Sequence, residues 1–293
     1  MAGYLETYRG SVAPWECDIV AHLTVAYYFE RFADSSLWLM EDLGLGQSYI
    51  EQAGRTCATV DCHVRYMAEL RAGDVLHIES APIGVEEKSL RLGHKVFNTA
   101  TGALCATLEQ TLVHFDLKAR KAVALPADKR DAILGRLVQW DGPAREVRAM
   151  PDSAEGFVES FRNTTRPWEV DVLGHVGFQF YIHRFSAACG HVMNAIGMTP
   201  EYHRKAGVGF STFEFQLQFR RELKAGDLVH CKTGVTHIGG SSLCFLHKMW
   251  NARTGELCAQ LSQFGVHLDM AARRPSPLPP EIKAKGLALL VKS

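Results

Sequence analysis

The sequence lacks an excess of charge of either sign. Its 32 lysine and arginine residues balance 32 aspartate and glutamate residues, and the pI is near neutral. Without a dominant basic surface, nucleic acids and anionic membranes are poor partners. We therefore expect neither nucleic acid nor membrane among the partners of this chain.

Long apolar runs are lacking too. None approaches the roughly 18 residues of a membrane-spanning helix, and Met1 to Glu6 lack the charged and then apolar pattern of a signal peptide. The eight cysteines form no Cys-x-x-Cys pair, and several lie within apolar runs. No tight cluster of cysteine and histidine suggests zinc. These absences predict a cytoplasmic protein with reduced, buried thiols and no metal or other cofactor.

What the sequence does contain is a repeat. Pro14-Trp15-Glu16-Cys17-Asp18 leads to His22, and Pro167-Trp168-Glu169-Val170-Asp171 leads to His175, at an offset of 153 residues. A register held across the whole chain is not a chance match, so the sequence predicts a duplicated fold with two related sites. Further matches at the same offset, without a gap, are Glu69 to Asp74 with Glu222 to Asp227, His77 with His230, His94-Lys95 with His247-Lys248, Leu104-Cys105-Ala106 with Leu257-Cys258-Ala259, and His114 with His267.

The repeat also sets the domain organisation. We expect a first domain over residues 1–137, a linker over 138–154 and a second domain over 155–293. The linker contains Gly142-Pro143 and Pro151, which favour irregular structure. Each domain is long enough to bury a core of its own.

Within each domain the pattern predicts one strand, a loop, one long helix and four strands. In the first domain the helix follows His22, is about 20 residues long by its helical spacing of apolar residues, and stops near Gly44. Short turns join consecutive strands, which favours antiparallel pairing. The predicted strands are 5–13, 56–66, 74–83, 89–98 and 104–117, with a short helix from Pro126; the second domain repeats this order with a strand at 156–165, a helix at about 177–196, four strands up to 269 and a final helix.

This order of elements resembles the hotdog fold, in which an antiparallel sheet wraps around a long central helix. The fold class that it implies is α+β, as a tandem or double hotdog. The phrase Asp-x-x-x-His ahead of the helix is similar to that of Asp-dependent hotdog thioesterases. That group is 4-hydroxybenzoyl-CoA thioesterase-like and acts on acyl-CoA and acyl-carrier-protein substrates, including carnitine-like or betaine-like acyl groups.

The two copies match that family phrase unequally. The second copy has Gly174-His175 and is the closer match, whereas the first has Ala21-His22. Both copies also depart from the fuller phrase, in which asparagine often stands two positions after the aspartate and again just after His-Val. Those two places hold Val20 and Thr24 in the first copy, and Leu173 and Gly177 in the second.

The resemblance implies hydrolysis of an acyl-CoA thioester to a carboxylic acid and free CoA. Asp18 and Asp171 are the candidates for general base or nucleophile, and His22 and His175 would orient water or polarise the carbonyl. Each loop leads into a helix N-terminus, whose free N–H groups favour an oxyanion. The structural alternatives stay open: an aspartate ahead of a helix is often an N-cap, and the histidines can serve hydrogen bonding alone.

Candidates for substrate binding are less specific. Trp15 and Trp168 stand three residues before each aspartate, where they could line an acyl pocket or hold a quaternary ammonium group, or belong to the core. Coenzyme A carries phosphates, which arginine and lysine bind well. Such cations stand near one strand-to-strand turn in each domain, where charged residues can equally form a solvated edge: Arg65, Arg71, Arg220 and Lys224.

Two other functions compete with thioester hydrolysis. Hotdog enoyl-CoA hydratases also use aspartate and histidine, but their phrase resembles Asp-x-Asn-Pro-x-His, and neither the Asn-Pro nor that spacing is present here. A non-catalytic acyl-CoA binding module is the second alternative. The sequence leaves open the acyl group and the half that is active. A homo-oligomer is expected, because sheet edges and helix faces offer interfaces.

Overall fold

The computed structural model describes residues 3–171 and 174–291 and divides the chain into two units, residues 1–145 and 146–293. The domain boundaries expected from the sequence, at 137 and 155, stay a prediction. Among the helices of the described residues, none combines the length and the apolar character needed to cross a bilayer.

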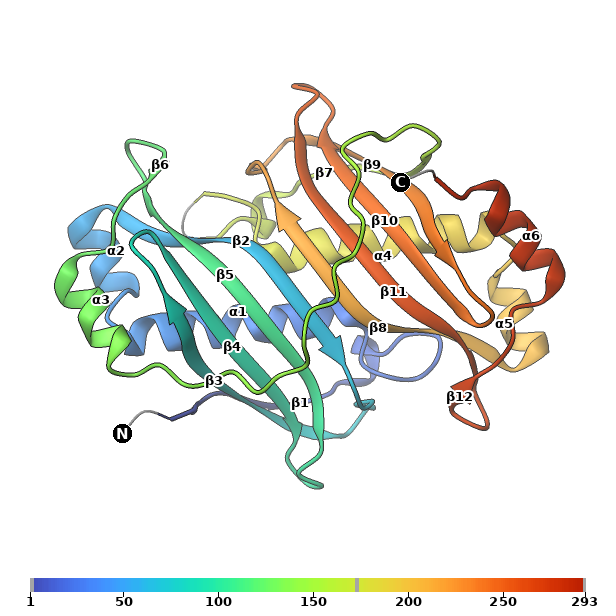
Figure 1. Cartoon of the computed structure of the whole chain (residues 1–293), viewed down its shortest axis with the longest axis horizontal. Coiled ribbons are helices and arrows are strands. Elements are labelled where there is room, and N and C mark those ends of the chain that lie inside the picture. The colour runs from blue at the N-terminus through green and yellow to red at the C-terminus, as the bar shows by residue number, and fades with distance from the viewer. Residues whose placement is uncertain (1–2, 172–173, 292–293) are drawn as a thin grey trace. The chain divides into compact units, whose positions relative to one another are not determined.

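The first unit is an antiparallel sheet with one long helix against it (Figure 1). Its five main strands pair in the order β1-β3-β4-β5-β2, and β6 adds a short pair to β5. The elements are β1 (Leu5–Ser11), η1 (Pro14–Glu16), α1 (Val25–Asp42), α2 (Gln47–Ala53), β2 (Arg55–Tyr66), β3 (Val75–Val85), β4 (Ser89–Asn98), β5 (Leu104–Asp116), β6 (Lys121–Ala122) and α3 (Ala127–Leu134).

The second unit repeats this architecture element by element. Its strands pair in the order β7-β9-β10-β11-β8, with β12 added to β11. The elements are β7 (Val158–Thr164), η2 (Pro167–Glu169), α4 (Phe178–Ala195), α5 (Pro200–Ala206), β8 (Val208–Phe219), β9 (Leu228–Ile238), β10 (Ser242–Asn251), β11 (Leu257–Asp269), β12 (Arg274–Pro275) and α6 (Pro280–Ala288). The tandem α+β architecture expected from the sequence is confirmed.

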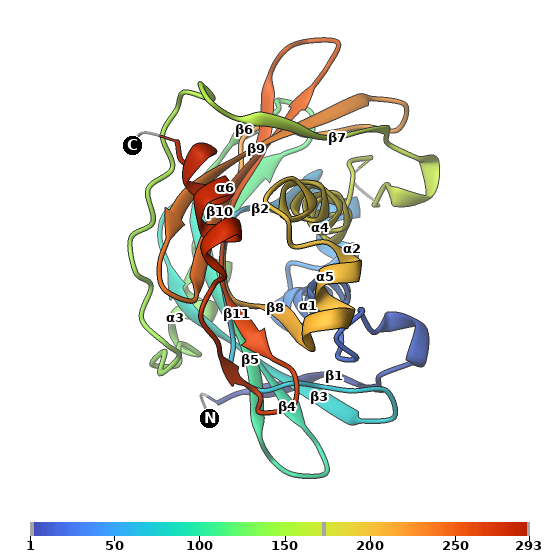
Figure 2. The same ribbon diagram turned by 90° about the vertical axis from the view of Figure 1, so that its right-hand side faces the viewer.

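The central helix of each unit lies against its own sheet, as α4 does in Figure 2. In the first unit α1 contacts β1, β3 and β4, and Phe29, Phe32 and Leu39 are fully buried there. Apolar residues recur at helical spacing in the sequence because this face of the helix forms the core. The helix is 18 residues long, close to the expected 20.

Under each central helix lies a buried polar cluster around a histidine. In the first unit Nδ1 of His94 lies 2.6 Å from Oγ of Ser80, and Nε2 lies 3.2 Å from Oε1 of Gln110. The second unit repeats the arrangement with Thr233, His247 and Gln263, at 2.7 and 3.2 Å. Burial lowers the pKa of both histidines to about 4. Both histidines therefore serve hydrogen bonding within the core.

Two lysines at one repeat position hold the segment that connects the units. The fully buried Lys248 donates from Nζ to the carbonyl oxygens of Pro151, Asp152 and Ser153 at 2.5, 2.7 and 3.1 Å. Burial lowers the pKa of its ammonium group. In the first unit Nζ of Lys95 lies 2.6 Å from Oδ1 of Asp141. The segment expected to be a linker is therefore anchored at residues 141 and 151–153.

Candidate active site

The loop of the first copy is a tight turn closed by backbone hydrogen bonds. A β-bridge joins Cys17 to Leu23, and the N–H of Asp18 donates to the carbonyl of His22 at 3.0 Å. The N–H of Ala21 donates back to the carbonyl of Asp18 at 3.0 Å. Ala21 has a φ of +63°, in the left-handed region that glycine favours. This geometry brings the aspartate and histidine together across four residues.

The second copy closes in the same way. Asp171 donates from its N–H to the carbonyl of His175 at 2.8 Å, and Gly174 donates to the carbonyl of Asp171 at 3.0 Å. Gly174, at φ +78°, occupies the position of Ala21 without a side chain to strain. Leu173, where the family phrase often has asparagine, lies outside the described residues.

Neither aspartate is a helix N-cap, so that alternative reading is wrong. The N-caps are Thr24 for α1 and Gly177 for α4, six residues after each aspartate. Instead, Oδ1 of Asp18 accepts the N–H of Val20 at 3.0 Å, and Oδ1 of Asp171 accepts the N–H of His175 at 3.3 Å. One carboxylate oxygen of each aspartate therefore organises its own loop.

The two histidines differ in the carboxylate that they contact. In the first copy Nδ1 of His22 lies 3.4 Å from Oδ2 of Asp18. In the second copy Nε2 of His175 lies 3.1 Å from Oε2 of Glu222. Asp171 thus contacts His175 at its backbone N–H, and Glu222 contacts the same residue at its imidazole. Both histidine side chains are largely buried, which strengthens such contacts.

Sequence reasoning did not single out Glu222 as a site residue. It lies in the turn between β8 and β9, 47 positions after His175, and only the fold brings the two together. One signal was available: Glu69 and Glu222 open the repeated phrase Glu-Leu-x-Ala-Gly-Asp. In the first copy Oε2 of Glu69 lies 3.2 Å from Nη2 of Arg71, one of the expected phosphate-binding residues.

The other cations expected at the site occupy different environments. Arg65 is half-buried on β2. Arg220 and Lys224 are exposed on either side of Glu222, and Arg220 donates from Nη2 to Oε1 of Gln218 at 2.9 Å. Exposed cations beside a largely buried histidine suit recognition of a polyanion. Arg220 and Lys224 therefore stand, with Arg221, among the exposed cations that flank the carboxylate partner of His175.

Both tryptophans of the repeated phrase are exposed. The exposed fractions are 78% for Trp15 and 73% for Trp168, so the interpretation as core residues is wrong. Large exposed aromatic side chains are uncommon and often mark a contact surface. The guanidinium carbon of Arg166 lies 5.7 Å from the ring centroid of Trp168. The residue in the place of Arg166 in the first copy is Ala13, which carries no charge.

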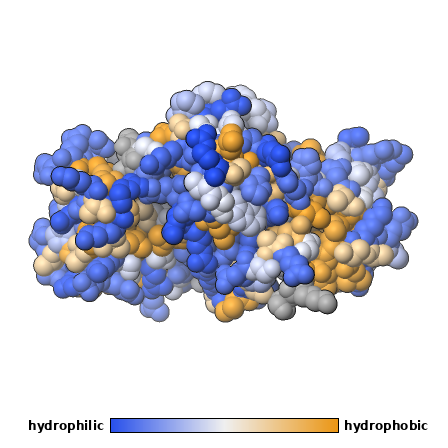
Figure 3. Space-filling model, turned by 90° about the horizontal axis from the view of Figure 1, so that it is seen from above, coloured by the Kyte–Doolittle hydropathy of each residue, from blue (hydrophilic) through white to orange (hydrophobic). Residues whose placement is uncertain are grey.

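The described surface and side chains offer no other obvious centre. Figure 3 shows one face on which hydrophilic residues surround several apolar patches. Among the described residues, no group of three or more His, Cys, Asp and Glu side chains could hold a metal ion. All eight cysteines are free thiols, and six are buried. The Asp–His loops are therefore the strongest candidates for chemistry.

Comparison with known proteins places this architecture in a family. The family model described as "Thioesterase-like superfamily" matches residues 12–137 and 165–286. Two curated relatives match about half of the chain. The L-carnitine dehydrogenase/betainyl-CoA thioesterase of Agrobacterium fabrum is 33% identical over 145 residues, 50% of this chain and 28% of that protein. The betainyl-CoA thioesterase of Pseudomonas aeruginosa is 26% identical over 151 residues, 52% of this chain and 91% of that protein.

The solved structures agree on the fold across both units. The 12:0-ACP thioesterase of Umbellularia californica has a TM-score of 0.69 and 14% identity, covering 92% of this chain and 93% of that one. The chain covers less than a third of the length of the Agrobacterium relative. With the family model matching in two blocks along most of the sequence, the chain belongs to the thioesterase-like superfamily as a tandem of two hotdog units.

Proposed function

We propose that this protein is an acyl-CoA thioesterase whose main site is the group Asp171, His175 and Glu222. The observation that carries the proposal is the 3.1 Å contact between His175 and Glu222, in a family of thioesterase-like proteins. A carboxylate that accepts from an imidazole fixes the orientation of the ring and favours its protonated form. That arrangement suits a group that must polarise a thioester carbonyl.

The chemistry needs one water and no cofactor. Asp171 would take a proton from water as the water oxygen attacks the acyl carbon, or attack that carbon itself to form an anhydride that water then opens. The carbonyl oxygen gains negative charge, which His175 and the N-terminus of α4 would stabilise. On either route the C–S bond breaks as the resulting tetrahedral intermediate collapses, before water opens any anhydride, and CoA leaves as a thiolate that needs little acid assistance.

The first copy would act more weakly. His22 contacts Asp18 at 3.4 Å, and Glu69, the counterpart of Glu222, lies 3.2 Å from Arg71. An arginine beside Glu69 competes with the imidazole for the carboxylate. We therefore expect Asp18 and His22 to contribute less to turnover than Asp171 and His175.

The substrate that we favour is a CoA thioester with a quaternary ammonium acyl group, because the curated relatives are named for betainyl-CoA. Trp15 and Trp168 are exposed aromatic faces of the kind that bind such cations. Arg166 stands over Trp168, whereas the first copy has the uncharged Ala13 in its place, so the two faces differ in the charge beside them. We assign the CoA phosphates to Arg220 and Lys224, with Arg65 and Arg71 as the corresponding cations of the first copy.

Self-association and a reducing compartment complete the proposal. Leu37 and Trp38 on α1 are 64% and 67% exposed, which would suit an interface in a homo-oligomer. Six buried thiols without a disulfide suit the cytoplasm. Light scattering of the intact chain, beside the double variant Leu37→Ser with Trp38→Ser, tests the first point. Fractionation of cells that express the chain tests the second.

A thiol-release assay over a panel of acyl-CoAs tests the proposed activity. The panel contains short, long, aromatic and quaternary-ammonium acyl groups. Asp171→Asn is expected to remove most of the turnover and Asp18→Asn less, with the double variant inactive. Full activity in the double variant would overturn the assigned chemistry. Hydration of crotonyl-CoA without thiol release would indicate a hydratase, and tight binding without turnover would indicate a binding module.

A further inference from the structure

A buried ion pair stands next to the candidate loop of the second copy. Nη2 of Arg184, on α4, lies 2.6 Å from Oε2 of Glu169, on η2. Both side chains are largely withdrawn from water. Withdrawing two charges from water is costly, so a pair of this kind needs good geometry and further hydrogen bonds to persist.

The guanidinium of Arg184 joins three segments around the loop. Nη1 donates to the carbonyl of Phe180 at 3.0 Å, in the first turn of α4. Nη2 donates to the carbonyl of Thr164 at 3.3 Å, at the end of β7, and Nε donates to Oδ1 of Asn163 at 3.2 Å. Together with Glu169, these contacts tie the strand before the loop to the helix after it.

Glu169 fixes both ends of the loop. Its Oε2 also accepts the N–H of Arg166 at 2.8 Å, which closes the turn before the loop. Its backbone carbonyl accepts the N–H of Gly177 at 2.9 Å, at the N-cap of α4. Between these contacts lie Asp171 and His175. The loop is thus held at its start and at its end by one residue, and that residue is held by Arg184.

The first copy repeats the ion pair and the Nη contacts of this arrangement, although Gly10 stands in the place of Asn163. Nη2 of Arg31 lies 2.7 Å from Oε2 of Glu16 and donates to the carbonyl of Ser11 at 3.0 Å, and Nη1 donates to the carbonyl of Tyr27 at 3.0 Å. The carbonyl of Glu16 accepts the N–H of Thr24 at 3.0 Å. The same ion pair therefore accompanies both loops.

We propose that Arg184 and Glu169 are positioning residues that hold Asp171 and His175 in register with the acyl group. This inference rests on the proposed thioesterase function of that loop. Displacement of a reacting group by about 1 Å can cost 10²-fold in rate. Loss of the pair should therefore lower kcat more than it changes KM.

Two conservative variants and a matched control test the proposal. Glu169→Gln keeps the shape and removes the charge, and Arg184→Lys keeps the charge and removes the fork. The control is Glu159→Gln, which makes the same chemical change in the exposed Glu159–Arg162 pair of the same unit. We expect kcat to fall by roughly 10²-fold in the two variants, with KM within about threefold of wild type, and no change in the control. In the double variant kcat should fall no further than in the more impaired of the two single variants, because both substitutions remove the same interaction.

A readout without turnover separates this inference from the proposed function. Hydrogen exchange reports the amides of Asp171, Gly174 and His175, which are hydrogen-bonded within the loop. Glu169→Gln and Arg184→Lys should speed their exchange while the strands of the sheet keep their protection. If the wild-type protein releases no thiol from any acyl-CoA, the proposed function is refuted. The exchange data would still show whether the Arg184–Glu169 pair holds the loop. An active wild type whose variants keep kcat and loop protection, or variants whose whole unit exchanges faster, would overturn the positioning role.

Discussion

Nε2 of His175 lies 3.1 Å from Oε2 of Glu222, whereas the corresponding His22 lies 3.4 Å from Oδ2 of Asp18 through its Nδ1 atom. The repeated phrase therefore builds two different surroundings for the same imidazole. In the second copy a carboxylate from the turn between β8 and β9 reaches the ring. This difference between the copies makes the site testable within one chain.

The first prediction concerns Glu222. Glu222→Gln removes the charge that orients His175, so we expect kcat/KM to fall by roughly 10- to 100-fold. The corresponding Glu69→Gln should change kcat/KM by less than about threefold, because Glu69 lies against Arg71. Steady-state thiol release measures both variants. Equal losses of kcat/KM in the two variants would show that both copies contribute to turnover.

The second prediction concerns the turn that presents each histidine. Ala21 has a φ of +63°, where an L side chain costs about 1 kcal/mol, and Gly174 has the same conformation with open space around it. We expect Ala21→Gly to stabilise the fold by about 0.5 kcal/mol after the entropy of the unfolded chain is subtracted. Gly174→Ala should destabilise it by about 1 kcal/mol. Urea midpoints of the two variants should therefore move in opposite directions, and a shift in the same direction would contradict the backbone argument.

The third prediction is a loss of stability in mild acid. His94 and His247 have pKa values of about 4 in the fold, below the 6.5 of an exposed imidazole. Between these values the unfolded chain binds protons that the folded chain does not, so stability falls as pH falls from 6.5 to 4. The gap corresponds to roughly 3 kcal/mol for each histidine.

Urea midpoints between pH 7 and pH 4 measure this loss. The double variant His94→Gln with His247→Gln should have a flatter pH dependence, although it is less stable at pH 7. His237→Gln, at an exposed position, is the control and should keep the slope of the wild type. An unchanged slope in the double variant would mean that other groups govern the acid response.

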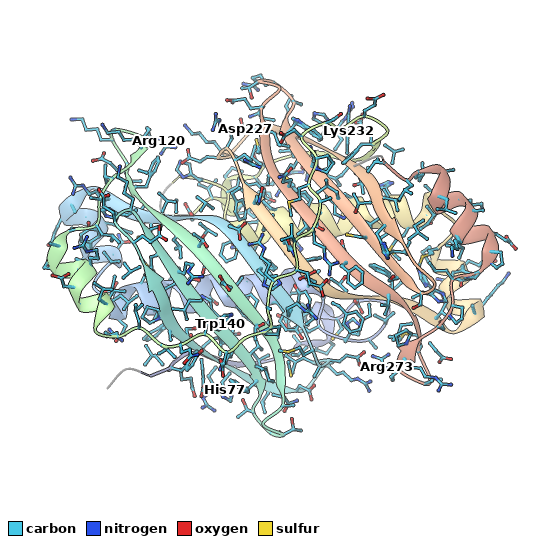
Figure 4. All side chains as sticks on the ribbon, in the orientation of Figure 1. His77, Arg120, Trp140, Asp227, Lys232 and Arg273 are labelled. Carbon is cyan, nitrogen blue, oxygen red and sulfur yellow. The ribbon has the colours of Figure 1, made fainter. Side chains whose placement is uncertain are left out.

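The fourth prediction concerns the contact between Trp140 and the sheet of the first unit, where Figure 4 marks that residue. A Cβ on Gly93 would lie 2.5 Å from Cζ3 of Trp140 and 3.0 Å from Cγ2 of Ile83. Gly93→Ala should destabilise the fold by about 2 kcal/mol. Trp140→Ala should remove part of that cost, so the double variant should lose less than the sum of the two.

A glycine with room around it provides the control for this experiment. Gly190, on α4, has no heavy atom within 4 Å of a built Cβ. Gly190→Ala should therefore stabilise the fold by about 0.5–1 kcal/mol, because alanine is the better helix former. Thermal unfolding followed by circular dichroism compares all four variants. Additive losses at residues 93 and 140 would show that the two do not touch in solution.

Most of the fold could be predicted from the sequence because it follows from local patterns. The strand expected at 89–98 matches β4 (Ser89–Asn98), and that expected at 104–117 ends one residue early in β5. Alternating apolar residues between turn glycines define such strands without reference to the rest of the chain. Because the sequence repeats, the same elements could be predicted for the second unit.

The short elements were not predicted, because they are too short to show a local pattern. The helices α2 and α5 have seven residues each, too few for a clear helical period, and β6 and β12 have only two. Gly54 and Gly207, which end α2 and α5 in the left-handed conformation, were the available signal. A glycine at the end of an otherwise ambiguous stretch could have identified both helices.

The site was only partly predictable because its partners are distant in the chain. The spacing of Asp171 and His175 is local, and the sequence identified both as candidates. The contact of His175 with Glu222 and that of Glu169 with Arg184 depend on how strand, loop and helix meet. The exposure of Trp15 and Trp168 could not be predicted either, because the sequence does not show which face of the loop is covered by the rest of the fold.

The three carbonyl oxygens around the ammonium group of Lys248 have a consequence for the proposed thioesterase activity. Thioesters acylate free amines, so any lysine near bound substrate is exposed to slow covalent damage. All three N–H bonds of Lys248 are engaged and its side chain is fully buried, which withholds its nitrogen from that reaction. Lys224 has an exposed side chain, so we expect it to be acylated before Lys248, which anchors the connecting segment.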